Sequence, residues 1–134
     1  MTPADAQSFL SENFAQWVLD LDLTVEEITA THVLTSMPLT ERLARVGGIV
    51  SGQALAAMAD TSMVLATAGH FGKFRPVATT NLDTQFLRPG TGDAITCRAE
   101  IVRAGKALVF TRAEMVAQPS GKGVATATAT FYVP

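Results

Sequence analysis

Apolar and polar residues alternate with a period of two in four runs in the second half of the chain. Such alternation places the apolar side chains on one face of a strand, so each run predicts a half-buried β-strand. Short connections rich in glycine or proline separate the runs, which favours antiparallel pairing. The four predicted strands are Val77–Leu87, Asp93–Val102, Ala107–Ala117 and Gly123–Val133.

The first part of the chain predicts a helix and a further strand. Thr2 followed by Pro3 is typical of a helix N-cap with proline at the first helical position, and apolar residues recur at helical spacing over Pro3–Leu19. The stretch Thr24–Met37 is rich in threonine, valine and isoleucine, which predicts a long strand. Leu39–Ala44 is predicted to form a short helical turn.

A second helix, over Gly52–Ala68, is predicted at the centre of the chain, with Gly69 and Gly72 ending it. It carries one charged residue, Asp60, so we expect it to be buried nearly all round. The alanine face of the last strand lets a helix approach closely. The order of elements predicts an α+β fold in which five antiparallel strands pack on one long helix.

Length, charge and cysteine content narrow the class of protein. A chain of 134 residues is the size of one domain, which we expect to span 1–134. Ten Lys and Arg are scattered among 12 Asp and Glu, which disfavours nucleic-acid binding. The single cysteine, Cys97, forms no internal disulfide and belongs to no zinc-ligand cluster. The N-terminus lacks a secretory signal, and we therefore expect a soluble, cytoplasmic protein.

Asp60 raises a chemical question, because burying an unpaired carboxylate is costly. One interpretation places it on a narrow polar stripe with Gln53 and Thr67, seven residues apart on the helix, facing water or another subunit. The other interpretation gives the carboxylate a functional role.

The start of the same helix offers a second candidate feature. Free N–H groups at a helix N-terminus suit an oxyanion or a carbonyl oxygen, and Gly52 lets a ligand approach the backbone. The simpler interpretation is that Ser51 is an ordinary N-cap. Together, an oxyanion site and a carboxylate suggest acyl transfer or hydrolysis. Gly52 and Asp60 are about 12 Å apart along one helix, so a symmetric dimer is needed to bring Gly52 of one copy opposite Asp60 of the other.

The segment from Gly48 to Thr61, GIVSGQALAAMADT, resembles the hotdog-fold acyl-CoA thioesterases of the phenylacetate-degradation (PaaI-type) family. That family carries His-Gly-Gly, then small or apolar residues, then Leu-x-Asp. The resemblance covers roughly Thr24 to the C-terminus. It implies a hotdog fold with a long central helix wrapped by a five-stranded sheet, assembly into homodimers and often homotetramers, and no metal or redox cofactor.

The resemblance also implies roles for individual residues. Asp60 matches the family's catalytic carboxylate, and Gly52 matches the glycine whose N–H polarises the thioester carbonyl. Thr79 falls where the family carries a Ser or Thr that holds the nucleophilic water. Ser51 replaces the family's histidine and is expected to supply a hydrogen bond in its place.

The substrate-binding residues implied by the resemblance lie in two places. Gln53 replaces the family's second glycine. The hairpin with Arg103, Gly105 and Lys106 resembles one whose basic residues meet coenzyme A phosphates. Strict alternation places Thr79 on one face of the strand and Leu82 and Phe86 on the other. The role implied for Thr79 therefore requires either a β-bulge or a site on the face that carries Thr79, at the dimer interface.

The sequence is therefore interpreted as an acyl-CoA thioesterase for a small aryl or acyl group, acting at a dimer interface. A non-catalytic hotdog protein that binds acyl-CoA or another small ligand is the alternative, favoured by the missing histidine. A hotdog hydratase is a third hypothesis. Its chemistry pairs a histidine with an acid, and the predicted central helix, ending at Ala68, carries no histidine.

Overall fold

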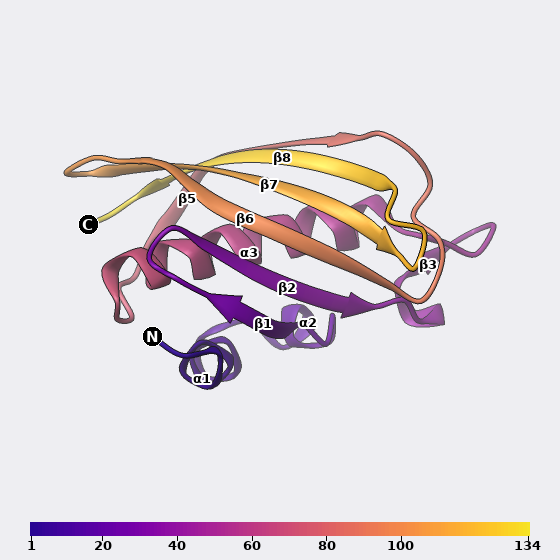
Figure 1. The fold of residues 1–134 in the computed structure, drawn as a ribbon, viewed down its shortest axis with the longest axis horizontal. Helices are drawn as coiled ribbons and strands as arrows, with labels where there is room; N and C mark the ends of the chain where they lie inside the picture. The colour runs from indigo at the N-terminus through magenta and orange to yellow at the C-terminus, as the bar shows by residue number, and fades with distance from the viewer.

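A computed structural model describes all 134 residues and shows one long helix, α3 (Gly52–Phe71), running along a curved antiparallel sheet (Figure 1). Six strands form this sheet in the order β1-β2-β6-β7-β8-β5. Their bounds are β1 Thr24–Ile28, β2 His32–Pro38, β5 Ala78–Phe86, β6 Ala94–Ala104, β7 Leu108–Gln118 and β8 Gly123–Tyr132. The predicted α+β fold, with one long helix against an antiparallel sheet, is confirmed.

The four strands predicted from alternation all form. Strands β6, β7 and β8 follow one another as antiparallel neighbours, and β5 pairs with β8 on the far side. Strand β5 therefore ends one edge of the sheet, and its other side has no partner within the chain. This edge becomes important for the candidate site.

The prediction of one strand over Thr24–Met37 was wrong. The stretch folds into the hairpin β1–β2, in which the amide of Thr29 donates to the carbonyl of His32 over 2.8 Å. The turn at 29–31 contains no glycine or proline, so alternation continues through it. The sheet has six strands instead of five as a result.

The predicted helix over Pro3–Leu19 is two helices, α1 (Pro3–Asn13) and α2 (Gln16–Leu19). The backbone of Phe14 is extended and ends α1. The N-cap prediction is confirmed, because the Asp5 amide donates to the Thr2 hydroxyl over 3.1 Å. A 3-10 turn, η1 (Glu41–Leu43), confirms the predicted helical turn.

The connection between the first hairpin and α3 contains a second, two-stranded sheet. It consists of β3 (Ala44–Arg45) and β4 (Ile49–Val50), which pair antiparallel. The amide of Val50 also donates to the carbonyl of Gly90 over 3.1 Å. This bond ties the start of α3 to the segment that follows β5.

The core lies between α3 and the sheet. Ala125, Ala127 and Ala129 of β8 are buried, as their alternation predicted. The hydroxyls of Thr35 and Ser62 form a buried hydrogen bond of 2.8 Å between β2 and α3. No helix of the chain combines the length and the apolar character needed to cross a bilayer.

Cys97 belongs to the hydrophobic core. Its side chain is fully buried. Burial raises the pKa of the Cys97 thiol to about 12, an effect only partly offset by hydrogen bonds with Ser62 and Thr35. A thiol with such a pKa is inert as a nucleophile at neutral pH.

Helix α3 extends beyond Ala68 to Phe71 and ends at Gly72, which adopts a left-handed conformation with φ of 70°. Gly69 lies inside the helix and does not end it. A Cβ at Gly69 would lie 2.5 Å from the carbonyl oxygen of Thr29 and 2.9 Å from the side chain of Ile28. Glycine is therefore required where α3 crosses the β1–β2 turn.

We predict that Gly69→Ala destabilises the protein by about 1–3 kcal/mol, because the added methyl group overpacks this crossing. In an unconstrained helix the same change is stabilising by roughly 0.5–1 kcal/mol, so the sign of the effect tests the packing. Urea unfolding measures it. Gly123→Ala is the matched control, because a Cβ there meets nothing within 4 Å. An increase in stability for Gly69→Ala would contradict the described contact.

Candidate active site

Helix α3 has one open stripe. Twelve of its 20 residues are buried, and residues that are exposed or only half-buried along its first turns share one face at spacings of three and four. These residues are Gln53, Ala56, Ala57, Asp60 and Val64. The prediction of a helix buried nearly all round was therefore wrong along this stripe.

The polar stripe proposed from sequence is only partly correct. Gln53 and Asp60 lie on the open stripe. Thr67 does not, because it is buried and its hydroxyl donates to the carbonyl of Val64 over 2.7 Å. The open stripe consists mainly of alanine and valine around one carboxylate, so it is better suited to contact with protein or ligand than to open water.

The carboxylate of Asp60 is held by strand β5. The hydroxyl of Thr79 donates to Oδ1 of Asp60 over 3.0 Å. A register shift between Thr79 and Asn81 in the β5–β8 pairing marks a β-bulge. The bulge resolves the conflict with strict alternation, because it turns Thr79 toward α3. The next residue, Thr80, donates instead to the carbonyl of Thr130 over 3.1 Å.

Burial controls the acidity of Asp60. Partial burial raises the pKa of the Asp60 carboxyl above its ordinary value, and the hydrogen bond from Thr79 lowers it by a smaller amount. The carboxylate has no cation as a partner. A carboxylate with a raised pKa is a stronger base than one in water, which is a property expected of a proton acceptor.

The first turn of α3 carries the second group. Ser51 is the N-cap, and its hydroxyl oxygen accepts the amide of Ala54 over 3.2 Å. The amides of Gly52 and Gln53 belong to the first turn, where N–H groups have no acceptor within the helix. The ring of Phe86 lies against Gly52, since a Cβ there would be 3.3 Å from Cζ of that ring. A side chain at position 52 would therefore crowd Phe86.

Gly52 and Asp60 do not meet within one chain. They lie on one helix, about 12 Å apart along its axis. Arg103, Gly105 and Lys106 lie at the tip of the β6–β7 hairpin, at the end of the sheet opposite β3 and the start of α3 (Figure 1). Of the residues predicted for the site, one copy brings together Asp60 with Thr79 and Gly52 with Ser51 and Gln53, but not the two groups with each other.

Two arginines beside Gly52 were missed by sequence reasoning. Arg45 and Arg88 line a cavity of about 290 Å³ that also contains Gly52. Arg88 lies two residues beyond the end of β5, and no signal in the sequence assigned it a role. Arg45 precedes Gly47 by two residues, and nothing in the sequence indicated that its hairpin folds against the end of β5.

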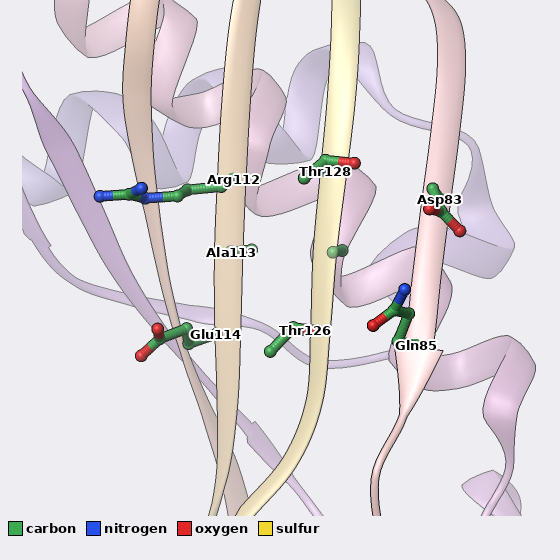
Figure 2. Close-up of a pocket in the computed structure, with 8 residues that line it drawn as sticks. Asp83, Gln85, Arg112, Ala113, Glu114, Thr126 and Thr128 are labelled. Atoms are coloured by element: carbon green, nitrogen blue, oxygen red, sulfur yellow. The ribbon is translucent and has the colours of Figure 1, made fainter.

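A second depression, of about 260 Å³, lies on the sheet surface and is lined from β5, β7 and β8 (Figure 2). Asp83, Arg112 and Thr128 are among the side chains that Figure 2 shows there. Arg112 is already paired with Glu100. The depression contains neither Asp60 nor Gly52, and we do not regard it as the active site. No group of three or more potential metal-ligating side chains occurs in the structure.

Comparison with known proteins identifies the family to which the chain belongs. Residues 47–124, more than half of the chain, match the Thioesterase superfamily. A Thermoplasma acidophilum protein named as a candidate esterase is 30% identical over 115 residues, which is 85% of this chain and 85% of that protein.

Solved structures share the fold. The E. coli PaaI protein, from the phenylacetic acid degradation operon, superposes with a TM-score of 0.83 at 21% identity, covering 100% of this chain and 96% of that chain. A hypothetical thioesterase from Streptococcus pneumoniae, solved with coenzyme A, has a TM-score of 0.77 at 20% identity, covering 84% and 85%. The expected hotdog fold is confirmed, and the chain belongs to the Thioesterase superfamily.

Proposed function

We propose that this protein is an acyl-CoA thioesterase of the PaaI type whose active site is completed by a second copy of the chain. The observation that carries the proposal is the hydrogen bond from Thr79 to Asp60, which holds a carboxylate of raised pKa on the open stripe of α3. Membership of the Thioesterase superfamily supports hydrolysis, and the Streptococcus pneumoniae structure with coenzyme A supports a CoA thioester as substrate.

The partner is proposed to approach along β5. This edge strand has no neighbour on its outer side, and Leu82 and Phe86 on it are 37% and 55% exposed. Unpaired strand edges and exposed apolar side chains are typical of protein interfaces. A twofold axis beside β5 runs the two α3 helices antiparallel, which brings Gly52 of one copy toward Asp60 of the partner subunit. Two such dimers can assemble into a tetramer.

In this arrangement the reaction is direct hydrolysis. The amide of Gly52 donates to the thioester carbonyl and stabilises the negative charge that develops on its oxygen. The carboxylate of Asp60 of the partner subunit takes a proton from water as the water attacks the carbonyl carbon. Alternatively, the carboxylate attacks that carbon itself, and water then hydrolyses the resulting anhydride, which releases the acid and restores the carboxylate. The C–S bond breaks, and the CoA thiolate leaves and is protonated. The substrate carries a small aryl or acyl group.

The supporting residues have narrower roles. The Thr79 hydroxyl donates a hydrogen bond to Oδ1 of Asp60, so Oδ2 remains free to accept a proton from the water. The hydroxyl oxygen of Ser51 accepts the Ala54 amide, so its O–H remains available as a donor to the substrate. Arg103 and Lys106 reach coenzyme A phosphates only from the partner subunit, since the β6–β7 hairpin that carries them lies at the other end of the sheet from β3 (Figure 1). Gly105 shapes that hairpin, and Gln53 adds a second helix-start amide.

The non-catalytic alternative rests on one observation. This chain has Ser51 where the PaaI-type family carries a histidine, and the hydroxyl oxygen of Ser51 accepts the Ala54 amide as the N-cap of α3. A protein of this second class binds acyl-CoA without turnover, so calorimetry and a hydrolysis assay on the same thioesters separate the two. For a hydratase, the helix does contain a histidine, contrary to expectation, but His70 is exposed and about 15 Å from Asp60 along the axis.

We predict that Asp60→Asn lowers kcat by about 10²–10⁴-fold, because the amide cannot accept the proton of the attacking water. Asparagine keeps an oxygen for the Thr79 hydroxyl, so the fold is retained. Thiol release from a panel of aryl, short and long acyl-CoA thioesters is the measurement. Asp83→Asn is the matched control, since Asp83 is an exposed carboxylate elsewhere on β5. Undiminished thiol release by Asp60→Asn would exclude the proposed mechanism.

We also predict an acid limb in the pH profile of kcat that is governed by Asp60. The carboxylate is active when ionised, so kcat rises as pH increases through the raised pKa of Asp60. Thr79→Val removes the hydrogen bond that lowers this pKa, and the limb therefore moves to higher pH. Thr80→Val, at the neighbouring position whose hydroxyl contacts a strand carbonyl, is the control. A limb that stays in place or moves to lower pH in Thr79→Val counts against the assignment.

A further inference from the structure

The cavity beside the start of α3 is open to solvent and is lined by both apolar and charged residues. It lies between the β3–β4 hairpin, the first turn of α3 and the segment after β5, and its volume is about 290 Å³. Val50 and Leu55 are buried and give it an apolar part. Phe86 and Gly52 line it as well, which places the proposed thioester contact in the same cavity. A cavity of this size accommodates a short acyl group.

The same cavity carries two positive charges and no negative one. Arg45 and Arg88 both line it, and no aspartate or glutamate does. The Arg45 guanidinium donates to the carbonyl of its neighbour Val46 over 3.1 Å and makes no salt bridge. Arg88 makes none either. By contrast, Arg42, Arg98 and Arg112 each contact a carboxylate.

Arg45 and Arg88 are both exposed and free to meet an anion at this cavity, and guanidinium groups bind carboxylates and phosphates with matched geometry. The acyl-CoA proposed as substrate offers an anion in two places, in the phosphates of coenzyme A and on the acyl group. The pantetheine arm between the thioester and the diphosphate is about as long as four extended residues, roughly 14 Å. That length exceeds the width of a compact cavity of about 290 Å³. The phosphates therefore lie outside the cavity when the thioester is at Gly52.

We propose that the cavity binds a short acyl group that ends in a carboxylate, and that Arg45 and Arg88 determine this specificity. The inference rests on the proposed function and deepens it by naming the class of acyl group. The apolar part of the cavity contacts the methylene groups, and the two arginines bind the distal carboxylate. Hydrolysis leaves that carboxylate unchanged and yields a dicarboxylic acid and coenzyme A.

The test compares glutaryl-CoA with hexanoyl-CoA, which have acyl groups of similar length and differ in the terminal charge. The readout is the ratio of their kcat/KM values after subtraction of the enzyme-free rates. We expect wild type to favour glutaryl-CoA by at least about tenfold. Arg45→Gln and Arg88→Gln each reduce the ratio by about tenfold, since each removes one charge-assisted hydrogen bond. Arg75→Gln, at an exposed arginine beyond the end of α3, keeps the ratio.

A second arm separates the two sources of anion. The same pair of acyl groups is presented as pantetheine thioesters, which lack the nucleotide and its phosphates. A ratio that persists with these compounds and falls in the two arginine variants supports the proposal. The other outcome is that the arginine variants lose kcat/KM equally for both CoA thioesters and lose none for both pantetheine thioesters. That outcome would assign Arg45 and Arg88 to the phosphates and overturn the proposal.

Two further results would overturn the proposal. One is a wild-type ratio near unity. The other is a change of oligomeric state, measured by light scattering, in the variant that combines Arg45→Gln with Arg88→Gln. Such a change would assign the arginines to subunit contact. Calorimetric binding of glutaryl-CoA and hexanoyl-CoA to wild type and variants tests the arginines without turnover. Absence of hydrolysis with a preserved binding preference therefore refutes the proposed function alone, whereas hydrolysis without preference refutes this inference alone.

Discussion

The packing of α3 against the concave side of the sheet is the constraint on which the other features depend. A helix with one charge in 20 residues has no stable place in water, so the sheet must cover most of its circumference. Small buried side chains on β8 leave room for the helix, and the buried hydrogen bond between Thr35 and Ser62 joins β2 to the face of α3 that meets the sheet. With the helix packed in this way, only one stripe of α3 remains open, and Asp60 lies on it.

The sequence predicted most of this architecture because alternation and helix composition are strong local signals. The four later strands and the central helix appear where their patterns placed them. The errors occur where tertiary contacts decide. Nothing local marks the turn after Ile28 or the extended backbone at Phe14 that divides the first helix. Gly69 resembles a helix stop in the sequence, but it is glycine because the β1–β2 turn packs against it and leaves no room for a side chain.

The candidate site shows the same division. Asp60 was singled out because a lone charge in an apolar helix is visible in sequence. Its contact with Thr79 depends on a bulge in β5, and alternation pointed that side chain the other way. The arginines at 45 and 88 come from two segments joined only by the fold, through the bond from Val50 to Gly90. Residues of this kind have no signature in a single sequence.

The unpaired edge of β5 affects how a newly made monomer behaves before it binds another copy. Nine residues of strand with unpaired backbone groups and exposed apolar side chains form a template that any extended peptide can join. The relative concentrations of folded and incompletely folded chains determine whether this edge pairs with a second folded copy or with an incompletely folded chain. Dilute, newly synthesised chains therefore carry a built-in aggregation hazard, which assembly along this side would remove.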